Sequence, residues 1–233
     1  MTPILGIITD HFPFYADLLP NLTIDNKPVY YWSYRHLWAA LDNLLSLFTS
    51  GALKEKKDGE IMKVVNEIIT KKGKVFRNEV ADWLKENTNL QVISYEVTME
   101  PYGIIHTEKN LGDIDIFAID HTSKIIYAIE CKNTVDSRAV HEMKTEIDKY
   151  LGRDGNTGLV QKHVARDLWL KANSSKLNHL VRNSHSYSIN SLILTAAEIP
   201  LAYLKENELP LPLISFHRLL MTNGNALKEL FEK

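Results

Sequence analysis

Acidic and basic residues interrupt two short apolar runs near the middle of the chain. Asp113 and Asp115 lie in the run 112–120, and Glu130 and Lys132 lie in the run 124–133. Unpaired buried charge is energetically expensive, so charged groups kept together in apolar runs usually have a use. Hard divalent cations prefer carboxylate oxygens as ligands. The residue types therefore point to a metal site with a lysine beside it.

Both runs have the composition of β-strands, because they are rich in Ile, Phe and Tyr and are bounded by turn-forming residues. Side chains alternate between the two faces of a strand. Strict alternation places Ile114 and Ile116 on the face opposite to Asp115, and it places Glu130 and Lys132 on one face of the second strand. Both faces are apolar away from the charges, which is typical of strands covered on both sides in an α/β protein.

The link between the two runs is short and polar, which predicts an antiparallel hairpin. A turn centred in the middle of the link places Asp115 opposite Glu130 and Asp113 opposite Lys132. Directly opposed residues have Cβ atoms roughly 4.5–5.5 Å apart. Two carboxylates at that spacing repel each other, so we expect strain in the metal-free site and relief when a shared cation binds.

Solvated acids and a surface lysine at the strand ends are the alternative interpretation. It accounts well for a lone aspartate. It accounts poorly for four charges on one face of two adjoining apolar strands, so we favour the interpretation as a site.

Asp115, followed by Glu130-Cys131-Lys132 on the next strand, resembles the PD-(D/E)xK nuclease superfamily. Fourteen residues separate Asp115 from Glu130, which suits a hairpin. The resemblance extends from about position 73 to position 215. No proline precedes the first acid, and a Gly-Asp-Ile-Asp run stands there instead. This leaves open whether Asp113 or Asp115 is the principal ligand, and the hairpin register favours Asp115.

The resemblance implies a role for each residue. Asp115 and Glu130 would bind Mg²⁺ or Mn²⁺, with the backbone carbonyl of Cys131 as a third ligand. Lys132 would orient or help to deprotonate the attacking water and would stabilise the charge of the transition state.

Auxiliary residues are also implied. Superfamily members often carry a further glutamate on the preceding helix, and the candidate is Glu79, with Arg77 or Asn78 as alternatives for that position. Asp113 would act as a second group near the metal or as a partner of Lys132.

The implied fold is a restriction-endonuclease-like αβββαβ sandwich with a central mixed sheet, in the α/β class. We expect a mainly helical N-terminal extension over 1–70 and a nuclease-like domain over 71–233. Apolar periodicity predicts the following elements: helices over 34–48, 60–70, 75–87 and 136–151, and strands over 91–97, 112–120, 124–133, 188–195 and 213–216.

A basic segment follows the predicted hairpin. Residues 156–186 carry five basic residues against one aspartate, a local net charge of +4. Lys162 and Arg166 are four residues apart on one helix and are expected to share a face, with His163 beside them. We expect these three residues to contact phosphates, which position a duplex without reading its sequence. A solvated helix face is the alternative.

Composition sets further bounds. The chain has 233 residues, 45% of them hydrophobic, with a net charge of −2, so a nucleic-acid site must be a local patch. Its single cysteine, Cys131, excludes an intrachain disulfide and is expected to be an inert core residue, which fits a reducing cytoplasm. No apolar run approaches the roughly 20 residues of a membrane span, so no membrane partner is expected.

These observations predict a Mg²⁺- or Mn²⁺-dependent endonuclease that hydrolyses phosphodiester bonds. The preferred substrate is DNA, and a restriction, anti-phage or mobile-element role is expected. The alternative is a catalytically silent nuclease-fold subunit that binds nucleic acid or a protein partner. The N-terminal extension is a candidate surface for a homodimer or for a protein partner.

Overall fold

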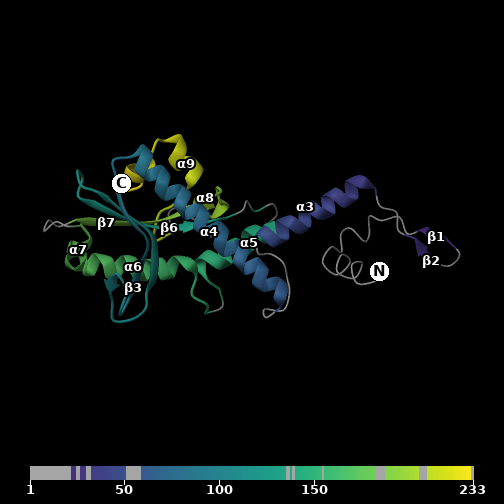
Figure 1. Ribbon diagram of the computed structural model, residues 1–233, viewed down its shortest axis with the longest axis horizontal. Coiled ribbons are helices and arrows are strands. Elements are labelled where there is room, and N and C mark those ends of the chain that lie inside the picture. The colour runs from purple at the N-terminus through teal and green to yellow at the C-terminus, as the bar shows by residue number, and fades with distance from the viewer. Residues whose placement is uncertain are drawn as a thin grey trace. The chain divides into compact units, whose positions relative to one another are not determined.

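The computed structural model describes most of the 233 residues, and the described ranges are 22–24, 27–29, 33–50, 59–134, 137, 140–153, 155–181, 187–204 and 209–231. The chain divides into two compact units, Met1–Val65 and Asn66–Lys233 (Figure 1). The division falls five residues before the boundary expected from the sequence. Each unit is described by itself.

The described residues of the first unit form two short strands, a helix and the beginning of a second helix. Strands β1 (Leu22–Ile24) and β2 (Lys27–Val29) pair in an antiparallel fashion. Helix α3 (Tyr34–Ser50) confirms the helix predicted from position 34. Ser33 caps it, because its Oγ accepts the His36 N–H at 3.3 Å.

Helix α4 (Glu60–Asn87) is one continuous helix where the sequence predicted two, over 60–70 and 75–87. The predicted break over 71–74, a stretch that contains Gly73, was wrong. A single glycine costs only about 1 kcal/mol relative to alanine inside a helix. Burial of the apolar face that carries Phe76, Val80 and Leu84 is large enough to offset that cost.

A six-stranded mixed sheet forms the centre of the second unit. Its strands run in the spatial order β4-β3-β5-β6-β7-β8. The bounds are β3 (Gln91–Glu100), β4 (Ile105–His106), β5 (Gly112–Asp120), β6 (Ile125–Lys132), β7 (Ser188–Thr195) and β8 (Leu213–Ser215). Strands β3, β5 and β6 are antiparallel neighbours, whereas β6, β7 and β8 are parallel. The predicted α/β class with a mixed central sheet is confirmed.

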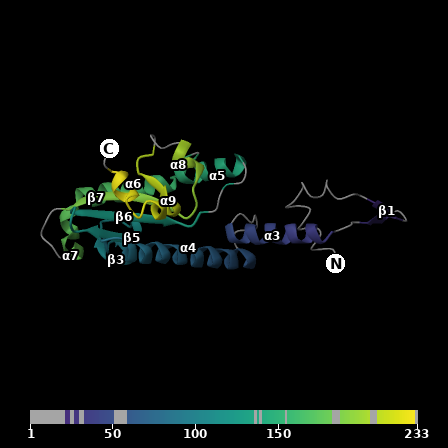
Figure 2. The same ribbon diagram turned by 90° about the horizontal axis from the view of Figure 1, so that it is seen from above.

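Helices cover both faces of this sheet. They are α5 (Val140–Leu151), α6 (Leu159–Ala172), α7 (Asn178–Val181), α8 (Pro200–Leu204), α9 (Phe216–Met221) and α10 (Ala226–Glu229), with a 3₁₀ turn η1 (Ser174–Leu177). Phe76 and Val80 of α4 pack on one face, and Leu170 of α6 packs on the other. Figure 2 shows α4 and α6 on opposite sides of the strands. No helix in the described ranges is long and apolar enough to cross a bilayer.

Several element boundaries differ from the sequence predictions. Strand β3 ends at Glu100, three residues later than predicted. Helix α5 begins at Val140, and positions 136, 138 and 139 of the predicted helix lie outside the described residues. Strand β8 ends at Ser215, one residue earlier than predicted, because Phe216 begins α9. Ser215 caps that helix by accepting the Arg218 N–H at 3.1 Å.

The β5–β6 hairpin has the predicted register. Its pairs run from Ile116 opposite Ile129 to Asp120 opposite Ile125. The Asp120 carboxylate accepts the backbone N–H groups of the next turn residues, those of 122 and 123, at 2.9 Å each. This arrangement of an aspartate over its own turn is a strong local determinant of register.

Strict alternation fails at the centre of β5. Ile114 and Phe117 belong to the same core cluster, whereas Ile116 belongs to the cluster on the opposite face. The prediction that Ile114 and Ile116 share a face was therefore wrong. On the neighbouring strand Glu96 has a φ of 60°, in the left-handed region, at the position opposite Asp115. Asp115 thus lies at a local irregularity, which releases its side chain from the regular pleat.

Candidate active site

Asp115 lies against the end of strand β6. Its Oδ2 accepts the backbone N–H of Cys131 at 2.8 Å, just beyond the last regular pair of the hairpin ladder. Burial raises the pKa of the Asp115 carboxyl, and the Cys131 hydrogen bond and the charge of Lys132 partly oppose that effect. The aspartate and the Glu130-to-Lys132 strand end therefore form one cluster.

Three basic groups surround the Glu130 carboxylate, which is only 8% exposed. Lys132 Nζ contacts Oε1, and Arg166 Nη1 lies 3.1 Å from Oε2. His163 Nε2 lies 3.4 Å from Oε1. Burial raises the pKa of Glu130, the charge of Asp115 adds to that effect, and the charges of Lys132 and Arg166 oppose it. Each oxygen of this carboxylate thus has a cation of the chain as its partner.

The sequence missed the contribution of helix α6 to this cluster. Lys162 is exposed as expected, but His163 and Arg166 are buried. The expectation that Lys162 and Arg166 form one solvent-facing stripe was therefore wrong. The buried face of α6 consists of Val160, His163, Arg166, Asp167 and Leu170. Arg166 points toward the sheet because its partner, Glu130, lies there.

His163 is held beside Arg166 as a neutral base. Burial lowers the pKa of His163 to about 2, and the neighbouring charges of Arg166, Lys132 and Lys162 contribute. The unprotonated Nδ1 can then accept a hydrogen bond from Arg166 Nη2. Arg166 therefore bridges the imidazole and the Glu130 carboxylate, which fixes the orientation of both.

The auxiliary residues are arranged differently from the expectation. Glu79 and Asp113 are exposed. Arg77 of α4 is buried and forms an ion pair with Glu96. Its charge also lowers the pKa of Asp115, against the raising effect of burial. Arg77, one of the alternatives for the Glu79 position, is thus the α4 side chain whose charge reaches the cluster.

The donor set suits a small hard cation. In the described part of the chain, no three His, Cys, Asp or Glu side chains gather around one point. Mg²⁺ does not need three, because it usually takes one or two protein carboxylates and completes its shell with water and phosphate oxygens. Asp115 and Glu130 are two carboxylates whose pKa values are both raised by burial. They fit such an ion if Lys132 Nζ moves away from Oε1 of Glu130 when the ion binds.

Cys131 is a core residue, as predicted. It is buried, and burial raises the pKa of its thiol well above the ordinary value. The thiol is therefore protonated and unreactive at neutral pH, and only its backbone could serve the site.

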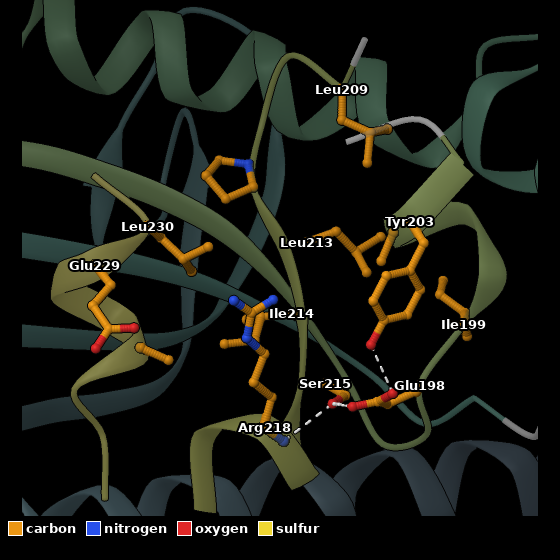
Figure 3. A pocket seen from close by; sticks show the side chains of 13 residues that line it. Glu198, Ile199, Tyr203, Leu209, Leu213, Ile214, Ser215, Arg218, Glu229 and Leu230 are labelled. Atoms are coloured by element: carbon orange, nitrogen blue, oxygen red, sulfur yellow. Dashed lines mark hydrogen bonds between the residues drawn. The ribbon is translucent and has the colours of Figure 1, made fainter. Parts of the chain in front are cut away.

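A separate cavity of about 290 Å³ lies near the ends of β7 and β8. In it the Glu198 carboxylate accepts hydrogen bonds from Tyr203 Oη at 2.7 Å and from Ser215 Oγ at 3.3 Å, and the Arg218 side chain extends between its walls (Figure 3). Ser215 lies two strands from Lys132 in the register of β6, β7 and β8, roughly 10 Å away. No residue of the predicted catalytic set lines this cavity.

Comparisons of the chain with protein-family models, with curated proteins and with solved structures find no match.

Proposed function

We propose that this chain is a metal-dependent nuclease that hydrolyses phosphodiester bonds, with DNA as its preferred substrate. One observation carries the proposal: Asp115 accepts the Cys131 N–H at 2.8 Å, between Glu130 and Lys132. This brings the two acids and the lysine of the PD-(D/E)xK pattern to one point. The element order α4, β3, β5, β6, α6 and β7 supports a restriction-endonuclease-like αβββαβ fold.

Asp115 and one oxygen of Glu130 would hold Mg²⁺ or Mn²⁺, with the carbonyl of Cys131 as a third donor. A divalent ion in this position supplies positive charge for the pentavalent transition state and lowers the pKa of a bound water. Lys132 Nζ already contacts Oε1 of Glu130. Its ammonium would orient the attacking water and stabilise the charge that develops on the phosphate.

Arg166 keeps Glu130 in place during these steps. It contacts Oε2 of Glu130 on one side and His163 on the other. Because both contacts are buried, the carboxylate cannot turn freely when Lys132 moves to water. A held carboxylate would leave Oε1 available to an ion shared with Asp115 once Lys132 moves away.

A second function has a specific observation in its favour. Lys132 and Arg166 occupy both oxygens of Glu130. A site whose own cations fully replaced the metal would fold in the same way and would not cut. The chain would then be a catalytically silent nuclease-fold subunit that binds nucleic acid or a protein partner.

Cleavage assays separate the two functions. Purified protein is incubated with supercoiled plasmid, linear duplex, single-stranded DNA and RNA, with Mg²⁺, with Mn²⁺ or with EDTA. We expect cleavage in either metal and none in EDTA. Lys132→Met should slow cleavage by on the order of 100- to 1,000-fold, whereas Lys109→Met, at an exposed loop position, should not slow it. Binding without cleavage in any metal would favour the silent subunit.

A further inference from the structure

An open groove of about 580 Å³ runs beside helix α4 within the second unit. Its α4 wall contains Lys71, Lys72 and Glu79, and its other wall contains Asn133 and Phe216. No motif in the sequence points to it, because its walls come from α4, from the end of β6 and from the start of α9.

One face of α4 lines the groove throughout. The lining positions on the helix are 68, 71, 72, 75, 76 and 79, and this spacing of three and four residues defines one side of a helix. The face extends over eleven residue steps, or about 16 Å at 1.5 Å per residue. That length matches about five nucleotides at a rise of 3.4 Å along one strand.

The lysines of this face are available for a ligand. Lys71 and Lys72 are exposed, and neither ammonium forms an ion pair with another described residue. Among the residues that the structure describes, Glu79 is the only acid in the lining. The whole chain has a net charge of −2, so two cations against one anion is a local reversal of sign. Such a local patch is what phosphate binding requires in a chain without overall positive charge.

The groove adjoins the candidate active site. Asn133 directly follows Lys132, and the N–H of Ala196, another lining residue, donates to the Lys132 carbonyl at 2.9 Å. The wall of the groove is therefore part of the backbone that carries Lys132. The groove lies on the α4 face of the sheet, whereas Glu130 contacts Arg166 of α6 on the other face. A strand leaving the groove would reach the site around the end of β6, where Lys132 lies.

We propose that this groove binds the phosphate backbone of the nucleic-acid strand, with Lys71 and Lys72 as the phosphate contacts. The exposed side chain of Val75 and the Phe216 wall would face the sugars and bases. The nature of the occupant rests on the proposed nuclease function. Contacts of this kind set the position of the strand and carry no sequence information.

The test is a salt titration of binding without turnover. Fluorescence anisotropy of a labelled duplex is measured in EDTA for wild type and for Lys71→Ala/Lys72→Ala. Each lost phosphate contact reduces the magnitude of the slope of log K against log salt by about 0.9 for a duplex and about 0.7 for a single strand. When both lysines are replaced, we expect the magnitude of the slope to fall by about 1.8 for a duplex and about 1.4 for a single strand. The fall should be the same for different sequences. Single-stranded DNA and RNA arms identify the preferred strand.

A charge-matched control is available. Lys85 and Lys109 are exposed and lie outside the groove, so Lys85→Ala/Lys109→Ala removes the same charge. This variant should keep the wild-type slope, and Lys71→Arg/Lys72→Arg should keep most of it. The groove assignment would be overturned if both double-alanine variants lost the same amount of salt slope, or if Lys71→Ala/Lys72→Ala lost none.

The groove and the nuclease proposal can fail separately. Cleavage by wild type together with an unchanged Lys71→Ala/Lys72→Ala slope refutes the groove alone. If the salt slope falls in Lys71→Ala/Lys72→Ala and the wild-type protein cleaves under no condition, the groove is supported and the catalytic proposal is refuted. A wild-type protein that binds no nucleic acid refutes the groove.

Discussion

Replacing Glu130 with alanine removes the partner of two cations in a buried cluster. The Arg166 Nη1 to Glu130 Oε2 distance of 3.1 Å corresponds to about 5 kcal/mol of attraction at an effective dielectric constant of about 20. The charge of Asp115 repels Glu130 and opposes these attractions. Because Lys132 and Arg166 both contact the carboxylate, two attractions act against one repulsion.

Repulsion between two facing carboxylates alone would make Glu130→Ala more stable than wild type, and we expect it to be less stable. Glu130→Ala should leave Arg166 buried without its carboxylate, and removal of one partner of a buried ion pair costs about 3–5 kcal/mol. For a domain of this size, each kcal/mol lowers the melting temperature by roughly 2–4 °C. The variant should therefore melt roughly 6–20 °C below wild type in the absence of metal.

Urea and thermal unfolding in EDTA measure this effect. Glu130→Ala combined with Arg166→Met removes both charges together and should regain a large part of the lost stability. Glu86→Ala, at an exposed position of α4, should change the unfolding free energy by less than about 0.5 kcal/mol. A Glu130→Ala protein that melts at or above the wild-type temperature would refute the claim that Lys132 and Arg166 balance this carboxylate.

Three further predictions follow from the same structure. Lys132→Ala should slow cleavage by on the order of 100- to 1,000-fold while calorimetry still detects Mn²⁺ binding, because the lysine acts on water and phosphate. Arg77→Met should lower the free energy of unfolding by less than about 1 kcal/mol in urea titrations, because its partner Glu96 is exposed and water can replace the lost contact. Asp120→Ala should lower it by about 1–3 kcal/mol at neutral pH, since the carboxylate holds the hairpin turn. Burial acts to raise the pKa of Asp120, but the hydrogen bonds from Ser123 and Thr122 outweigh burial and lower the pKa. The stabilisation is therefore present above the pKa that Asp120 has in the unfolded chain, and it is lost as the pH falls through the lower pKa of the folded protein. The unfolding free energies of wild type and Asp120→Ala should therefore converge in acid.

The hairpin was predictable because its determinants are local. Period-two apolar patterning fixed the two strands, and the short polar link fixed the register that places Ile116 opposite Ile129. That register places Asp115 opposite Glu130, and the Asp115 side chain accepts the backbone N–H of the following residue, Cys131. The break in alternation beside Asp115 was not predictable, because it depends on the backbone of Glu96 on another strand.

The orientation of helix α6 was not predictable from its own sequence. Lys162, His163 and Arg166 are all polar, and helical spacing alone does not say which of them faces the sheet. The choice depends on Glu130, which lies 36 residues before Arg166 in the chain. Burial of Arg166 is favourable only where a carboxylate receives it, so the partner had to be placed first.

Helix α4 continues where the sequence prediction left a gap. The two predicted helices covered 60–70 and 75–87, and the lysine-rich stretch between them contains Gly73. The helix continues through it because glycine without proline weakens a helix and does not end it. The continuous helix carries Lys71 and Lys72 into the same wall as Glu79, and a broken one would not.

Plasmid cleavage by two aspartate variants tests the central claim most directly. Asp115 contacts the Cys131 N–H, whereas Asp113, two residues away on the same strand, is exposed. Asp115→Asn keeps the shape of the side chain and removes its charge, and Asp113→Asn is its matched control. In Mg²⁺ or Mn²⁺, the account predicts that Asp115→Asn loses cleavage by at least on the order of 100-fold and that Asp113→Asn cleaves like wild type. Wild-type cleavage by Asp115→Asn would contradict the account.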